Sequence, residues 1–141
     1  MKKLGVIFVL MLSLVSCLGN DSKKTNINDY YGRWTLFNMG VRNTNVTVDK
    51  LEWQETYDFN TDGTFMKTRI KEGEKTTASG KFVVKKIDNE TNFELIYNEK
   101  TDIIGSCLGD LTESLTLNKE NLLVSNWQMC DGPGLIYKKS K

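Results

Sequence analysis

Short runs of alternating apolar and polar residues recur along most of the chain, separated by clusters of turn-forming residues about 8 to 12 positions apart. In residues 51–59, Trp53, Tyr57 and Phe59 share one parity and would therefore lie on one face of a β-strand. The polar part of the chain sustains no helical period. The pattern therefore predicts an all-β fold.

We predict eight strands, within residues 29–37, 51–59, 64–71, 78–87, 93–98, 113–117, 122–127 and 135–138. Because short turns join most of them, the strands should form an antiparallel meander, which can close into an up-and-down barrel without free edges. The polar residues 39–50 predict mainly a loop, in which residues 46–48 leave room for a short strand. The mixed parity of residues 64–71 does not define the inward face of that strand.

The sequence Asn-Thr-Asp-Gly at residues 60–63 predicts a type I turn followed by a glycine in the left-handed bulge position. A hairpin closed by this turn would bring two predicted strands together in a defined register. That register sets Phe59 opposite Phe65 and Glu55 opposite Arg69.

Residues 58–63 also satisfy the first half of an EF-hand calcium loop, Asp-x-Asn-x-Asp-Gly. The twelfth position is Arg69 instead of a bidentate glutamate, and strand-like runs replace the flanking helices, so the hairpin is the better interpretation. Glu52, Glu55 and Asp58 offer paired carboxylates for catalysis, but on a strand Glu55 points away from the other two. Exposed acids opposite Lys and Arg explain these three residues more simply.

The composition removes several function classes. The chain has 19 Lys and Arg against 18 Asp and Glu and no basic stripe, so nucleic acid is not an expected partner. The absence of histidine excludes Ser-His-Asp and Cys-His nucleophiles, histidine bases and histidine-ligated metals. We therefore expect no enzymatic activity, metal or cofactor, although glycosidase-type carboxylate chemistry remains open.

The N-terminus combines a positive start at residues 1–3 with an apolar run over residues 4–15 that is too short to span a bilayer. The run ends in Leu-Val-Ser-Cys at residues 14–17, which resembles the lipobox of bacterial lipoproteins. The resemblance implies cleavage between Ser16 and Cys17 and a fatty-acyl anchor, such as palmitate, on Cys17. The simpler alternative is an apolar start followed by a chance cysteine.

This interpretation divides the chain into a helical signal peptide at 1–16, a flexible tether at 17–29 and a barrel domain at 30–141. The polar composition of the tether is equally that of a frayed terminus. Cleavage leaves 125 residues, enough for one domain with a core, with 17 basic and 18 acidic side chains. We expect a monomer that its lipid anchors in the bacterial cell envelope, at the outer membrane.

Cys107 and Cys130 remain as an even pair once Cys17 is assigned to the lipid. In a chain that leaves the cytoplasm, such a pair is more often a disulfide than two free thiols. Closing this loop would stabilise the fold by about 3 kcal/mol in the chain-entropy model. We therefore predict a bridge between Cys107 and Cys130.

Gly32-Arg33-Trp34 matches the Gly-x-Trp signature that opens the first strand of lipocalins, and the long loop and meander that follow strengthen the match. Residues 62–65 and 134–138 also resemble the small lipocalin-like domains of bacterial lipoproteins. The resemblance covers nearly the whole barrel domain. It implies a calyx that binds a small apolar molecule, with Trp34 at its closed end.

The chain departs from lipocalins in three respects. It has no helix after the eighth strand, and residues 101–103 lack the tyrosine of the lipocalin Thr-Asp-Tyr motif. The arginine that packs over the lipocalin tryptophan has no counterpart, and Lys138 is the nearest substitute. Trp34 can equally plug the barrel floor without touching a ligand.

Four aromatic residues are candidates to line a ligand pocket, although core packing explains them equally well. They are Phe59, Phe65, Phe82 and Tyr97. The favoured function is a lipid-anchored barrel that binds or carries a small hydrophobic ligand in an apolar interior cavity. The alternative is a solid barrel that contacts a partner protein or inhibits an enzyme through residues 39–50 and the region of Cys107 and Cys130. A carboxylate hydrolase would need two inward acids in a cleft.

Overall fold

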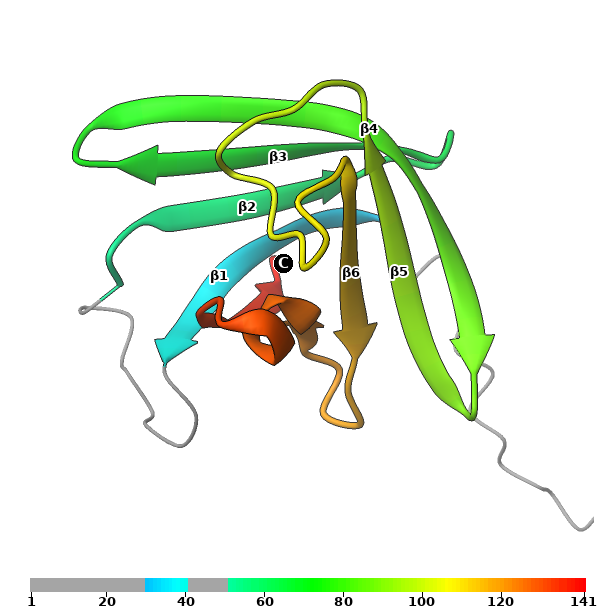
Figure 1. The fold of residues 1–141 in the computed structure, drawn as a ribbon. Helices are drawn as coiled ribbons and strands as arrows, with labels where there is room; N and C mark the ends of the chain where they lie inside the picture. Colours follow the sequence, from blue (N-terminus) through cyan, green and yellow to red (C-terminus); the bar gives the residue numbers. More distant parts are fainter. Residues whose placement is uncertain (1–29, 41–50) are drawn as a thin grey trace, which may run out of the picture.

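The computed structural model describes residues 30–40 and 51–141, in which eight antiparallel strands form one closed barrel (Figure 1). The predicted fold class is therefore confirmed. The strands are β1 (Gly32–Gly40), β2 (Gln54–Phe59), β3 (Thr64–Lys71), β4 (Glu74–Ile87), β5 (Glu90–Tyr97), β6 (Thr112–Leu117), β7 (Leu123–Ser125) and β8 (Gly134–Lys139). A short 3₁₀ helix, η3 (Asn126–Cys130), separates β7 from β8. The predicted signal peptide, tether and strand at 46–48 lie outside the described residues.

The barrel closes because each strand pairs with the next along the chain and β8 returns to β1. Trp34 lies opposite Lys139 and Leu36 opposite Tyr137 in this last ladder, with a bulge between Leu36 and Asn38. Closure leaves no strand of the barrel with a free edge along its whole length.

Turn chemistry fixes the register of the β2–β3 hairpin as predicted. The amide of Gly63 donates to the carbonyl oxygen of Asn60 at 3.2 Å, and Gly63 has φ 82°, in the left-handed region. The ladder confirms both expected cross-strand pairs, Phe59 with Phe65 and Glu55 with Arg69.

Alternate residues of the strands point inward and form a largely aromatic core. In β3, Phe65 and Lys67 point inward. The structure thus defines the inward face of this strand, which the mixed parity of residues 64–71 did not. The largest fully buried apolar side chains are Trp34, Tyr57, Phe59, Phe65, Phe93, Leu95, Tyr97, Leu115, Leu123, Leu135 and Tyr137.

Gly80 on β4 lets two of these rings meet. It pairs with Phe65 on one side and Tyr97 on the other, and the two ring centroids lie 4.9 Å apart in an edge-to-face arrangement. A Cβ atom at this position would lie 2.0 Å from the carbonyl oxygen of Ile96 and 2.9 Å from the Phe65 ring. The barrel wall therefore requires a glycine here.

Several predicted strand boundaries differ from the structure: β2 begins at Gln54 instead of residue 51, β4 at Glu74 instead of 78, and β5 at Glu90 instead of 93. Strand β1 continues to Gly40 because Met39 is buried and pairs with Leu135, so the predicted loop at 39–50 starts too early. The predicted strand at 122–127 ends at Ser125, because the Ser125 hydroxyl accepts the amide of Trp127 at 3.2 Å and begins η3.

Candidate functional site

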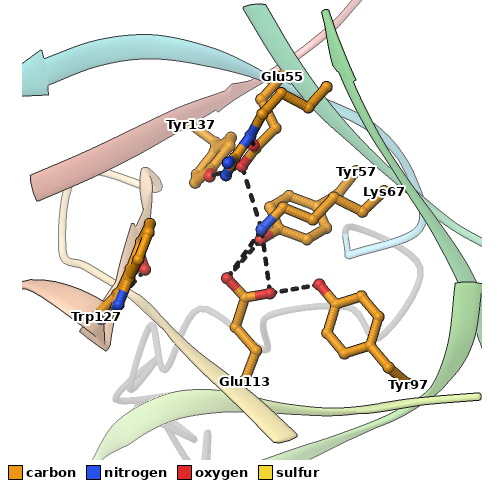
Figure 2. Close-up of polar contacts among 9 residues, drawn as sticks. Glu55, Tyr57, Lys67, Tyr97, Glu113, Trp127 and Tyr137 are labelled. Atoms are coloured by element: carbon orange, nitrogen blue, oxygen red, sulfur yellow. Dashed lines mark hydrogen bonds and ion pairs between the residues drawn. The ribbon is translucent and has the colours of Figure 1, made fainter. Parts of the chain in front are cut away.

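Two carboxylates and one ammonium group meet inside the barrel (Figure 2). The Nζ atom of Lys67 on β3 lies 3.3 Å from Oε1 of Glu55 on β2, and 3.1 Å and 3.2 Å from the carboxylate oxygens of Glu113 on β6. All three side chains are completely buried. Because β3 and β6 are not neighbours in the sheet, the Lys67–Glu113 pair spans the barrel interior.

Arg69, also on β3, balances the charge of this group. Its Nε atom donates to Oε2 of Glu55, so two cations face two carboxylates. We call Glu55, Lys67, Arg69 and Glu113 the interior charge cluster. Charges of both signs that neutralise one another in this way offset part of the cost of removing each from water.

Three tyrosine hydroxyls complete the hydrogen bonds of the two glutamates. Tyr57 and Tyr97 donate to the two oxygens of Glu113, the first at 2.8 Å, and Tyr137 donates to Oε1 of Glu55 at 2.5 Å. Burial first, and then the charge of the nearest glutamate, raises the pKa of each of these tyrosines well above its ordinary value. The three hydroxyls therefore stay protonated at neutral pH and act as donors.

The expectation that Glu55 is an exposed acid is wrong, because the residue is only 1% exposed. The parity that turns Tyr57 and Phe59 inward also turns Glu55 inward. Two inward carboxylates are thus present, as a hydrolase would require, but each is bound by a cation and at least one tyrosine and neither is exposed to solvent. In this arrangement the carboxylates of Glu55 and Glu113 are buried, hydrogen-bonded parts of the barrel core.

A cap covers the Glu113 side of the cluster. It consists of residues 98–111, the long yellow loop between β5 and β6 in Figure 1, together with η3. The predicted disulfide between Cys107 and Cys130 is present and joins the two parts, with a Cα–Cα distance of 5.5 Å. Among the cap residues, Ile103 is 3% exposed and belongs to the core.

Glycine allows the cap to approach the cluster closely. A Cβ atom on Gly105 would lie 2.6 Å from Oε1 of Glu113 and 3.3 Å from the ring of Trp127. On Gly132, a Cβ atom would lie 2.3 Å from the same ring. Trp127 is therefore packed between two glycine backbones beside the cluster, as Figure 2 shows for its position relative to Glu113.

Trp34 lies in the core near the start of β1; its place at the closed end of a ligand calyx stays a prediction. The side chain is 2% exposed, and its Nε1 atom donates to the carbonyl oxygen of Tyr30 at 3.0 Å. Lys139 lies opposite Trp34 in the ladder, whereas the ammonium of Lys138 lies 5.8 Å from the centroid of the outward Phe37 ring. Lys138 is therefore not the substitute for the lipocalin arginine.

The four aromatic residues predicted to line a pocket are inside the barrel, where they contact one another. The ring centroid of Phe59 lies 4.7 Å from that of Phe82 and 6.3 Å from that of Phe65, which in turn contacts Tyr97. Contact of these residues with a ligand stays a prediction.

A pocket opens in the barrel wall where β1 and β2 separate. Their ladder ends at the pair Thr35 and Thr56, after which β1 continues to Gly40 against β8. The pocket has a volume of about 260 Å³, and we call it the wall opening. It is lined by Thr35, Leu36, Leu51, Gln54, Glu55, Thr56, Thr68 and Ile70.

Two buried donors of the inner strand face, on Trp53 and Arg69, have no partner. The guanidinium carbon of Arg69 lies 4.3 Å from the centroid of the Trp53 ring. Within the described part of the chain, Nη2 of Arg69 and Nε1 of Trp53 are buried without a hydrogen-bond acceptor. Leaving a buried donor unpaired costs about 1–3 kcal/mol, so this pair is a costly feature of the fold.

Ser16 and Cys17, the predicted cleavage and lipidation residues, lie outside the described residues. In the part of the chain that the structure covers, no three Cys, Asp or Glu side chains group as metal ligands would. That part also holds no helix of the length and apolar character that a membrane-spanning helix needs.

The interior charge cluster was not among the predicted sites, although the strand parity of its acidic residues carries a signal for it. Glu55 shares its parity with Trp53 and Tyr57, and Glu113 shares its parity with Leu115. The direction of the Lys67 side chain could not be predicted from parity, because the apolar residues Met66 and Ile70 lie on the opposite parity and are exposed. An acid on the apolar parity of two strands indicates a buried ion pair as one option, because a cation beside a buried carboxylate offsets part of the cost of its desolvation.

The fold and the site together define an eight-stranded antiparallel closed barrel with a buried charge cluster and a disulfide-fastened cap. No family model, no curated protein and no solved structure matches the chain.

Proposed function

We propose that this chain is a lipid-anchored protein of the bacterial cell envelope that binds a small, largely apolar molecule in the wall opening. One observation carries the proposal: the pocket of about 260 Å³ where the β1–β2 ladder ends. Small-molecule sites are concave, mostly apolar and supplied with a few polar groups. The opening matches this description, because Leu36, Leu51 and Ile70 provide aliphatic surface and three threonines provide hydroxyl and methyl groups.

The proposal places the ligand in the wall because the interior is filled by other contacts. The Phe59, Phe82 and Phe93 rings pack together, and Lys67 occupies the centre of the barrel between two glutamates. A deep calyx would require these side chains to move and would leave buried charges unpaired, which is costly. The volume of the opening, about 260 Å³, lies just below the usual range of about 300–1,000 Å³, so the ligand should be small or only partly enclosed.

The anchor in the proposal rests on the lipobox resemblance of residues 14–17. A barrel tethered to a membrane by its first mature residue meets molecules that partition into that membrane at high local concentration. The proposed function, binding such a molecule at the envelope and handing it over, uses both the anchor and the wall opening.

Titration with phenylnaphthylamine, a neutral apolar fluorophore, tests the proposal. Residues 18–141 contain every strand of the closed barrel and so serve as the soluble form. Thr56→Phe fills the opening from its outer rim, whereas Val83→Phe places the same side chain on the outer face of β4, opposite Glu94 and away from the lining residues. We expect saturable binding to the wild type and to Val83→Phe, and an affinity at least tenfold lower for Thr56→Phe. Equal binding to all three proteins, or none to the wild type, would refute the proposal.

A second candidate function, contact with a partner protein, is favoured by two exposed side chains on the cap. Leu108 is 82% exposed and Met129 is 78% exposed, beside the two ends of the Cys107–Cys130 bridge. Apolar side chains on a surface held rigid by a disulfide lose little entropy when a partner covers them. Affinity capture with the wild type and with a Leu108→Ser, Met129→Ser variant tests this function: a partner recovered equally by both proteins would exclude the cap as the contact surface.

A further inference from the structure

The edges of two strands border the wall opening, and they carry an inference that rests on the proposed function. The ladder between β1 and β2 ends at Thr35 and Thr56. Within the part of the chain that the structure describes, β1 continues through residues 36–40 against β8 alone, and β2 begins at Gln54 against β3 alone. Two strand segments on either side of the opening therefore have no strand partner on the side that faces it.

Strand geometry defines what the edge of β1 offers to a ligand. In an antiparallel sheet, one residue directs its N–H and C=O groups to one neighbouring strand, and the next residue directs them to the other. Over residues 36–40, β8 uses the groups on one side, and the groups on the other side point toward the opening without a strand partner. A row of free backbone donors and acceptors is a template for another extended chain.

The side chains around the opening suit an added strand. Leu36, Leu51 and Ile70 supply aliphatic surface in a pocket of about 260 Å³, which is smaller than the usual drug-sized site. Because successive side chains of a strand point to opposite faces, one apolar side chain can enter this pocket while its neighbours stay in solvent. The pocket and the free edge thus match two parts of the same extended chain.

The charge of the opening favours a neutral ligand. Glu55 is the one charged residue in the lining, and its carboxylate is already bound by Lys67 and Arg69. The backbone of a peptide is neutral and supplies both donors and acceptors along its length. It therefore complements a free strand edge better than an ion does.

We propose that the molecule bound in the wall opening is a peptide in extended conformation, which adds a strand to the free side of β1 beyond Thr35. Its backbone exchanges hydrogen bonds with residues 36–40 and continues on β1 the pairing that β2 begins. One apolar side chain of the peptide enters the pocket among Leu36, Leu51 and Ile70. In this mode of recognition the backbone bonds give affinity, and the pocket selects the side chain.

Titration of residues 18–141 with the capped peptide acetyl-Val-Lys-Val-Thr-Val-amide tests the backbone pairing. N-methylation removes an amide donor and keeps every side chain, and successive amides of a strand face opposite sides. One isomer is methylated on its second and fourth residues, and the other on its third and fifth. We expect the parent peptide to bind and one isomer to bind at least tenfold more weakly than the other. Two isomers that bind as tightly as the parent peptide would overturn the inference.

The neutral fluorophore separates this inference from the proposed function. The peptide should displace phenylnaphthylamine from the wild type and from the control Val83→Phe, and should bind at least tenfold more weakly to Thr56→Phe. Binding of phenylnaphthylamine without binding of the peptide would overturn the inference and leave the proposed function intact. Binding of neither would refute the proposed function.

Removal of the two caps identifies the source of the peptide. A capped peptide that binds as tightly as the free-ended one would show that the site accepts a segment of a longer chain. Binding that requires a free end would instead identify a short free peptide as the ligand.

Amide hydrogen exchange measures the free edge directly. In residues 36–40 of the free protein, the amides that face away from β8 should exchange at least tenfold faster than those that face it. Saturating peptide should slow the first set at least tenfold and leave the second unchanged. Slow exchange of both sets before peptide is added would show that the edge is already paired, and would overturn the inference. Slowing that depends on protein concentration, with a dimer in sedimentation, would assign the edge to a second copy of the chain and contradict a peptide ligand.

Discussion

The ammonium nitrogen of Lys67 lies 3.1 Å from Oε1 of Glu113, although their strands, β3 and β6, are separated in the barrel by β4 and β5. This buried ion pair crosses the interior and is completed by Glu55 on the other side. The centre of the barrel therefore consists of balanced charges surrounded by aromatic packing, and removal of one charge alone would leave its partner buried and unpaired.

Replacement of Lys67 should strongly destabilise the fold. Lys67→Met keeps much of the side-chain volume but leaves two buried glutamates with one cation, so we expect the free energy of unfolding to fall by about 3–5 kcal/mol. Urea denaturation measures this change. Adding Glu113→Gln to Lys67→Met should recover part of the loss, and a loss below about 1 kcal/mol in the single variant would argue against a buried ion pair.

Stability should fall at alkaline pH because of the three buried tyrosines. Their pKa values are raised above the ordinary value of 10.0, so the folded state holds these protons more tightly than the unfolded state. Their contribution is complete below about pH 10 and is lost as the pH rises further, by up to about 1.4 kcal/mol per pH unit for each tyrosine. Urea denaturation in a series of buffers measures the slope. Tyr97→Phe should make the loss of unfolding free energy with rising pH less steep, by the contribution of one tyrosine. An unchanged slope would contradict the burial of this hydroxyl.

The disulfide should stabilise the barrel and immobilise the cap. Cys107→Ser with Cys130→Ser opens a closed loop with a sequence separation of 23, which should lower the free energy of unfolding by about 3 kcal/mol. Amide hydrogen exchange should also become faster around Ile103 and Gly105, because the bridge no longer fastens their loop to η3. Unchanged exchange in the double variant would show that core packing alone holds the cap.

Gly80 should be among the least replaceable glycines. Gly80→Ala would place a Cβ atom 2.0 Å from the Ile96 carbonyl oxygen, so the β4–β5 ladder must shift, and we expect a loss of about 3 kcal/mol or more. Gly109→Ala is the control, because its Cβ atom would meet no heavy atom within 4 Å and only the positive φ of 67° opposes it. That variant should lose about 1 kcal/mol. Thermal unfolding that ranks the two variants in the reverse order would contradict the close approach at Gly80.

The sequence predicted those parts of the fold that depend on local chemistry. The turn at residues 60–63 defined its own register, and the inward parity of β2 followed from Tyr57 and Phe59. The bridge between Cys107 and Cys130 followed from counting the cysteines.

The interior charge cluster could not be assembled in the same way, because it joins β2, β3 and β6 across the barrel. Whether Glu113 faces Lys67 depends on how the closed sheet curves, which alternation along one strand does not define. The wall opening depends on the point at which β1 leaves β2 for β8, and this is a property of strand pairing.

The lipobox makes a prediction that is independent of the barrel. Cys17→Ser should prevent lipid attachment, so the chain should leave the membrane fraction of a bacterial host and lose its fatty-acid label. Cell fractionation with labelled palmitate measures both results. A variant that remains in the membrane fraction as completely as the wild type would show that another feature holds the chain there.

Native mass spectrometry of residues 18–141, produced in an oxidising compartment and exposed to an envelope lipid extract, tests the central claim most directly. The account predicts a protein mass two hydrogens below that of the reduced chain, together with one bound small molecule that Thr56→Phe does not retain. A wild-type chain that carries no small molecule, or a Thr56→Phe chain that carries the same one, would contradict binding in the wall opening.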